Sequence, residues 1–285
     1  MTPSTKLRQL MTESAPVVAP GAYDGLSARL VERAGFPAVY ASGGAISRST
    51  GLPDLGLISM NEIVARLQQM VDAISVPLIA DADTGYGNAL NVQHAVRAFQ
   101  RAGVAGIHLE DQTFPKRCGH YDDKSIVSTR EMAQKLKAVK DASGDDFVLI
   151  ARTDALAVEG YERTIERSHA YMEAGADVIF VEAPTSVEQI ESIAKDLPYP
   201  KLINMFASGK TPLMPAERLG ELGYAIVIIP SDTQRAAIGA MMRTLDAIKR
   251  DGDSGALQNE MASFRDREVI IGTDDYMALD KQYAA

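Results

Sequence analysis

Eight short apolar runs recur along the chain, each followed by a turn and a helical pattern. The runs are near-continuous rather than alternating, as in Val148-Leu149-Ile150-Ala151, which predicts strands buried on both faces of a parallel sheet. Their spacing of roughly 20 to 40 residues leaves room for one crossover helix after each strand. The predicted strands are Val17–Pro20, Ala38–Ser42, Pro77–Asp81, Gly106–Glu110, Phe147–Arg152, Val178–Glu182, Lys201–Asn204 and Ala225–Pro230.

Eight strand–helix units in a chain of 285 residues favour an α/β fold of the (β/α)8 TIM-barrel type. The alternative is an open doubly wound sheet, but no G-x-G-x-x-G follows the first strand, which disfavours its dinucleotide-binding form. No linker divides the sequence, so we expect a single barrel domain over residues 1–285, with 234–285 as a C-terminal helical extension. An apolar stripe on Gln234–Arg250 suits either the last barrel helix or a contact with a partner subunit.

Composition excludes several classes of function. Lys and Arg (29) are outnumbered by Asp and Glu (38), and the net charge of −9 argues against binding of nucleic acid or of an anionic membrane. No apolar run is long enough to span a bilayer and the N-terminus lacks the apolar core of a signal peptide, so we expect a cytoplasmic protein. The single cysteine excludes an internal disulfide and a cysteine-based zinc site.

Charged and amide side chains gather at the carboxyl ends of five consecutive predicted strands, the edge at which barrel enzymes hold their active sites. Asp81 ends the third strand, Asp83 lies two residues further on, and Glu110 ends the fourth strand. Three converging carboxylates repel one another unless a cation lies among them, and oxygen ligands favour Mg²⁺, with Mn²⁺ as a substitute. The alternative is an ion-pair network with Arg152. A magnesium site of this kind is completed by substrate oxygens, which points to a small chelating anion such as a 2-oxo or 2-hydroxy acid.

A loop after the fourth predicted strand holds a second polar group, Lys116-Arg117-Cys118-Gly119-His120. A lone cysteine is usually a buried structural residue, but these neighbours do not build a core, and their positive charge would keep a thiol reactive. Near the second strand, Ser42-Gly43-Gly44 can bind a carboxylate through backbone N–H groups, and Asp54 can bind metal-linked water. Tyr40 is either a proton carrier or a structural tyrosine.

Together these motifs resemble the isocitrate lyase/phosphoenolpyruvate mutase superfamily, over essentially the whole chain. The resemblance is closest to the short lyase branch, which includes 2-methylisocitrate lyase, 2,3-dimethylmalate lyase and oxaloacetate hydrolase. It implies a (β/α)8 barrel, Mg²⁺, and a homotetramer of dimers that exchange their eighth helix. The matching motifs are Ser42-Gly43-Gly44, Gly51-Leu52-Pro53-Asp54, Asp81-Ala82-Asp83-Thr84-Gly85-Tyr86-Gly87, His108-Leu109-Glu110-Asp111-Gln112, Lys116-Arg117-Cys118-Gly119-His120 and Ala151-Arg152-Thr153-Asp154-Ala155.

The resemblance also implies roles by position. Cys118 would be the general acid on a gating loop. The catalytic set would be Tyr40, Lys116, Cys118, His120 and Arg152. The metal ligands, some acting through water, would be Asp54, Asp81, Asp83 and Glu110. The substrate-binding set would be Ser42, Gly43, Gly44, Gly119, Arg152, Glu182 and Asn204.

The implied activity is Mg²⁺-dependent retro-aldol cleavage of a 2-hydroxy di- or tricarboxylate, of the 2-methylisocitrate or 2,3-dimethylmalate type, to a 2-oxo acid and a second carboxylate. The alternatives are P–C chemistry of the carboxyphosphonoenolpyruvate or phosphoenolpyruvate phosphonomutase type, and oxaloacetate hydrolysis. Phosphonomutases usually lack a cysteine at position 118, which favours C–C cleavage. One departure leaves the substrate open, because Ala207 stands where the lyases carry glutamate and Phe206 where methylisocitrate enzymes carry threonine.

Overall fold

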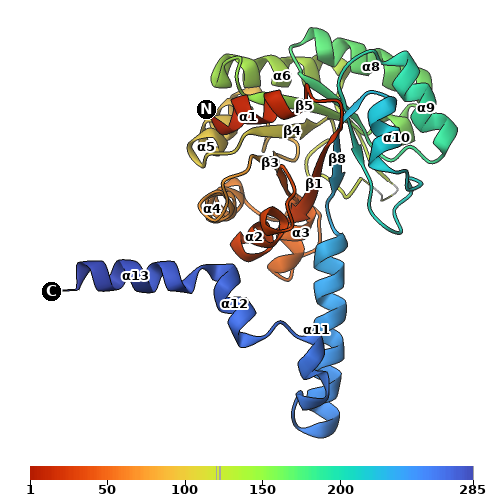
Figure 1. Cartoon of the computed structure of the whole chain (residues 1–285). Coiled ribbons are helices and arrows are strands. Elements are labelled where there is room, and N and C mark those ends of the chain that lie inside the picture. Colours follow the sequence, from red (N-terminus) through yellow and green to blue (C-terminus); the bar gives the residue numbers. More distant parts are fainter. Residues whose placement is uncertain (120, 122, 285) are drawn as a thin grey trace. The chain divides into compact units, whose positions relative to one another are not determined.

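A closed barrel of eight parallel strands forms the centre of the computed structural model, which describes residues 1–119, 121 and 123–284 (Figure 1). Each strand pairs with its sequence neighbour, and β1 pairs with β8 to close the barrel, with Val17 opposite Ile226. The predicted barrel is confirmed, and the predicted strand ends differ by at most two residues. The strands are β1 (Val17–Ala22), β2 (Val39–Ala41), β3 (Leu78–Asp81), β4 (Gly106–Glu110), β5 (Val148–Thr153), β6 (Val178–Val181), β7 (Lys201–Asn204) and β8 (Tyr224–Ile229).

Helices surround the barrel, as Figure 1 shows for α4, α5, α6 and α8. Several of them begin at side-chain caps; Ser59, for example, accepts from the backbone N–H of Glu62 while the Glu62 side chain accepts from the backbone N–H of Ser59 in return. The helices up to β8 are α1 (Pro3–Leu10), α2 (Gly25–Arg33), α3 (Gly43–Ser49), α4 (Met60–Val71), α5 (Ala89–Arg101), α6 (Thr129–Ser143), α7 (Ala155–Val158), α8 (Tyr161–Glu173), α9 (Val187–Asp196) and α10 (Ala216–Glu221).

Both faces of the strands are buried, which explains their near-continuous apolar sequence. In β5, Val148 and Ile150 belong to the cluster that fills the barrel interior. Leu149 lies on the other face of the strand, in the same apolar cluster as Leu136 and Val139 of α6. Because side chains alternate along a strand, one run supplies two cores, and polar side chains are confined to the strand ends.

Contacts divide the chain into two compact units, residues 1–232 and residues 233–285. The helix predicted at 234–250 is present within α11 (Asp232–Asp251), and it is followed by a 3₁₀ turn (Gly255–Glu260), α12 (Phe264–Ile271) and α13 (Thr273–Tyr283). Among the residues that the structure describes, no helix is long and apolar enough to cross a membrane. The apolar stripe of α11 is exposed in the single chain; its exposed members are Ile238, Met241, Met242, Leu245 and Ile248.

Candidate active site

The Lys116 ammonium lies among carboxylates at the carboxyl end of the barrel. Its Nζ is 2.5 Å from Asp54 Oδ1 and 2.9 Å from Asp83 Oδ1, and the side chains of Lys116 and Asp54 are nearly fully buried. Burial alone would lower the pKa of Lys116, but Asp83 and Asp54 raise it well above its usual value, so the ammonium stays charged. Residues from three separate sequence motifs therefore meet at one point.

A neutral pair, Tyr40 and His108, lies beside Asp81. The Tyr40 hydroxyl is 2.6 Å from His108 Nε2, and that nitrogen is 3.4 Å from Asp81 Oδ1. Burial lowers the pKa of His108 to about 3 and raises that of Tyr40 well above its usual value, so both rings are neutral at pH 7. His108 was not among the predicted site residues, although its place two residues before Glu110 at the end of β4 is a signal that could have found it.

Arg152, from β5, is surrounded by three carboxylates. Its guanidinium lies 3.0 Å from Asp154, 3.3 Å from Glu110 and 3.6 Å from Glu182. Burial would lower the pKa of Arg152, but these three carboxylates raise it well above its usual value. The ion-pair alternative to a metal site is thus realised for Glu110, whereas Asp83 pairs with Lys116 instead. A permanent, buried guanidinium in a polar pocket is suited to a carboxylate ligand.

The acidic residues fit a divalent cation in donor chemistry. Neither Glu110 carboxylate oxygen has a hydrogen-bond partner among the described residues, and burial raises the Glu110 pKa well above its usual value, despite Arg152 and Lys116. An ammonium between Asp54 and Asp83 shows that this position favours positive charge. In the described part of the chain, no three His, Cys, Asp or Glu side chains are yet gathered around one metal position. The metal assignment to Asp54, Asp81, Asp83 and Glu110 stays a prediction.

Cys118 lies half-buried in the loop between β4 and α6, whose sequence around it is polar. The Gln112 side chain holds the preceding peptide, because its Oε1 accepts from Arg117 N and its Nε2 donates to Arg117 O, both at 2.8 Å. On the other side, Gly119 packs against Arg152 and Glu182. The predicted His120 lies outside the described residues.

The loop backbone approaches the pocket so closely at position 119 that a side chain would collide there. A Cβ on Gly119 would lie 2.6 Å from Glu182 Oε1 and closer still to Arg152 Nη2. We expect Gly119→Ala to displace the loop and lower kcat about tenfold, because a group misplaced by 1 Å loses much of its effect. Steady-state kinetics with a melting curve tests this, and full activity in a folded variant would contradict it.

The start of α3 approaches Asp81 in a similar way. A Cβ on Gly43 would lie 2.6 Å from Asp81 Oδ2, so only glycine fits. Ser42 caps this helix, because its Oγ accepts from Ala45 N at 3.2 Å. The structure therefore brings the Ser42-Gly43-Gly44 turn next to Asp81, and its predicted role in binding a carboxylate stays a prediction.

At the end of β7, buried Asn204 has a side-chain oxygen without a hydrogen-bond partner among the described residues. Three residues later the backbone N–H of Ala207 donates to the Asp232 carboxylate, 3.1 Å away at the nearer oxygen. Asp232 was not predicted. The resemblance expects a glutamate at position 207. The Asp232 carboxylate lies next to this position, and it accepts a hydrogen bond from the backbone N–H of Ala207.

The family model described as phosphoenolpyruvate phosphomutase matches residues 7–249. The chain belongs to this family. It is 42% identical to a 2,3-dimethylmalate lyase of Eubacterium barkeri, with 100% of this chain and 99% of the relative covered. It is also 42% identical to a 2-methylisocitrate lyase of Bacillus subtilis, with 98% and 92% covered. These matches confirm the family resemblance that the motifs indicated.

Two solved structures share the fold over nearly the whole chain. An oxaloacetate acetylhydrolase in complex with the inhibitor 3,3-difluorooxalacetate superposes with a TM-score of 0.93 at 37% identity, covering 99% of this chain and 97% of the other. A phosphonopyruvate hydrolase in complex with oxalate and Mg²⁺ superposes with a TM-score of 0.90 at 32% identity, covering 99% of both chains. Similar barrels of this family thus carry different reactions.

Proposed function

We propose that this protein is a carbon–carbon lyase that cleaves a 2-hydroxy di- or tricarboxylate of the 2,3-dimethylmalate or 2-methylisocitrate type. Cys118 carries the proposal, since it is the only cysteine in the chain and its loop is packed onto the buried Arg152. A proton donor beside a fixed cation is what retro-aldol cleavage requires, because a carbanion forms and must be protonated. The 42% identity to the two lyases supports the same reaction class.

In this reaction a carboxylate of the pocket accepts the proton of the substrate hydroxyl, and the bond between the hydroxyl-bearing carbon and its neighbour breaks. The first carbon becomes the carbonyl of a 2-oxo acid, and the neighbour receives the electron pair. Arg152 stabilises the developing charge on the second carboxylate, and the Cys118 S–H gives its proton to the carbanion. Glu182 and Asn204 line the pocket, while Ser42, Gly43 and Gly44 bind the substrate carboxylate.

Tyr40 keeps its hydroxyl proton at physiological pH and does not act as a base, because burial and the nearby Asp81 raise the Tyr40 pKa well above the physiological range. Asp54, Asp81, Asp83 and Glu110 would hold Mg²⁺, which would supply Lewis-acid stabilisation of substrate oxygens. The Lys116 ammonium, now paired with Asp54 and Asp83, must share these carboxylates with the ion.

A parallel assay separates the proposed reaction from its alternatives. The purified protein with Mg²⁺ is offered 2-methylisocitrate, 2,3-dimethylmalate, oxaloacetate and phosphonopyruvate, and the products are identified by mass spectrometry. We expect a 2-oxo acid from one of the first two. Oxalate from oxaloacetate alone would favour hydrolase chemistry, which the similarity to the acetylhydrolase makes the second candidate. Turnover of phosphonopyruvate alone would overturn the lyase proposal.

The exposed stripe of α11 supports a homotetramer in which the C-terminal helices pack on a partner subunit. Solvent-exposed apolar side chains at helical spacing are costly unless a partner covers them. We expect the double variant Met242→Glu, Leu245→Glu to dissociate the tetramer, as measured by light scattering. Arg243→Glu, an exposed change on the opposite side of α11, is the control, and a double variant that remains tetrameric would contradict the proposal.

A further inference from the structure

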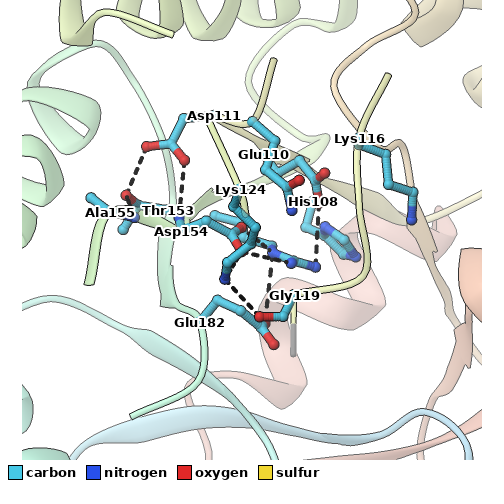
Figure 2. Close-up of polar contacts among 12 residues, drawn as sticks. His108, Glu110, Asp111, Lys116, Gly119, Lys124, Thr153, Asp154, Ala155 and Glu182 are labelled. Atoms are coloured by element: carbon cyan, nitrogen blue, oxygen red, sulfur yellow. Dashed lines mark hydrogen bonds and ion pairs between the residues drawn. The ribbon is translucent and has the colours of Figure 1, made fainter. Parts of the chain in front are cut away.

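Lys124 lies in the same loop as Cys118 and was not among the predicted site residues. Its side chain is only 2% exposed. The ammonium donates to the backbone oxygen of Gly119 at 2.6 Å and to Asp154 Oδ1 at 2.7 Å, as Figure 2 shows. Lys124 therefore joins the peptide that follows Cys118 to a carboxylate of the barrel.

The carboxylate at the other end of this link belongs to a residue whose backbone is held in place. Asp111 Oδ1 accepts from the backbone N–H of Asp154 at 2.9 Å, and Asp111 Oδ2 accepts from Thr153 Oγ1 at 2.7 Å, as Figure 2 shows. Asp111 Oδ2 also accepts from Tyr171 OH at 2.8 Å. The same Asp154 carboxylate holds Arg152 Nε through its second oxygen at 3.0 Å. Asp154 is thus a rigid point that both the guanidinium and the loop share.

The two peptides that flank Cys118 are held by different side chains. Gln112 holds Arg117 on one side, and Lys124 holds Gly119 on the other. Without the Lys124 ammonium, the link between Gly119 O and Asp154 is lost, while the hydrogen bonds from Gln112 to Arg117 remain.

We propose that Lys124 is a positioning residue, whose link between Gly119 and Asp154 holds the Cys118 thiol in register with the Arg152 guanidinium. It touches neither substrate nor metal in this role. It sets the distance between the proton donor and the cation that binds the substrate. Its effect on turnover rests on the lyase function proposed above, whereas its effect on the loop does not.

The test compares Lys124→Met, which keeps length and removes charge, with Lys124→Arg and with Lys137→Met, an exposed lysine of α6. The first readout is the rate at which iodoacetamide alkylates Cys118 in the Mg²⁺-loaded protein without substrate, a signal free of background because the chain has one cysteine. We expect about a tenfold faster rate in Lys124→Met, the effect of losing one hydrogen bond to a charged group. Lys137→Met should match the wild type and Lys124→Arg should restore much of the slow rate.

The second readout is the split between kcat and KM. In Lys124→Met we expect kcat to fall about 10²-fold with KM nearly unchanged, because the displaced group acts only in the transition state. A purely structural lysine would lower the melting temperature and leave both the alkylation rate and kcat as in Lys137→Met, which would overturn the proposal. If Lys124→Met does not fold, Asp154→Asn weakens the same link from the other end and must also speed alkylation. Faster alkylation in a protein without lyase turnover would refute the proposed function but not the positioning role.

Discussion

Replacement of Cys118 by serine is expected to lower kcat by about 10²-fold or more while the fold stays intact. Serine keeps the size and the hydrogen-bonding capacity of cysteine, but its hydroxyl is a far weaker acid than a thiol and gives up its proton reluctantly. Cys118 is half-buried in a polar loop, so the change removes little apolar packing. Steady-state kinetics with the substrate found in the parallel assay, together with a melting curve, measures both parts of this prediction.

Tyr121→Phe is the matched control for Cys118→Ser. Tyr121 lies in the same loop and is exposed, and its link to Cys118 runs through the backbone, since Tyr121 N donates to Cys118 O at 2.9 Å. Removing its hydroxyl should leave kcat unchanged. Undiminished turnover in Cys118→Ser would remove the thiol from the mechanism, whereas a loss shared by both variants would indicate a general effect on the loop.

The barrel was predictable because its signals are local. A strand buried on both faces must be apolar along its length. Polar residues are tolerated at its carboxyl end, which opens toward the active-site face of the barrel. Runs such as the one at 148–151 therefore mark the strands, and Asp81, Glu110 and Arg152 mark the mouth. The C-terminal helices were harder to place, because several of their large apolar side chains, such as Met242 and Leu245, are exposed in the single chain.

Pairings in the site were less predictable, since they join residues far apart in the sequence. The carboxylates and Lys116 could be singled out from the sequence. The sequence did not predict that the Lys116 ammonium lies between Asp54 and Asp83. It did not indicate the contact between Tyr40 and His108, which depends on β2 and β4 facing the same interior. Lys124 carries no local signal at all, because only the folded loop brings it to Asp154. The polar residues of the site can be predicted from their places at the strand ends. Which of them pair with one another depends on how the strands are aligned in the folded barrel.

Asp83→Asn is expected to lower the metal-dependent kcat by about 10³-fold or more. Without this ligand charge the ion binds poorly, and its Lewis-acid stabilisation of the transition state, worth several kcal/mol, is lost. The amide has the size of the carboxylate, so packing is preserved. The direct readout is calorimetric titration with Mg²⁺ alone, in which the wild type should bind and the variant should bind far more weakly. Asp141→Asn, an exposed change on α6, removes the same charge away from the site and should leave both binding and turnover unaltered.

The stability of the metal-free protein separates loss of the ion from loss of the fold. Burial, with Asp81 and Asp54 adding to it, raises the pKa of Asp83 to about 6 against the opposing effect of Lys116. A carboxyl whose folded pKa lies above its unfolded value of about 4 stabilises the fold in its protonated form, and that stability is lost as the pH rises through 6. At pH 7 the Asp83 charge therefore costs folding free energy in the absence of metal, and Asp83→Asn should melt no lower than the metal-free wild type.

Added Mg²⁺ should then raise the melting temperature of the wild type only, because an ion that binds the native state alone stabilises it. A fully active Asp83→Asn, or one stabilised by Mg²⁺ as strongly as the wild type, would refute the metal assignment.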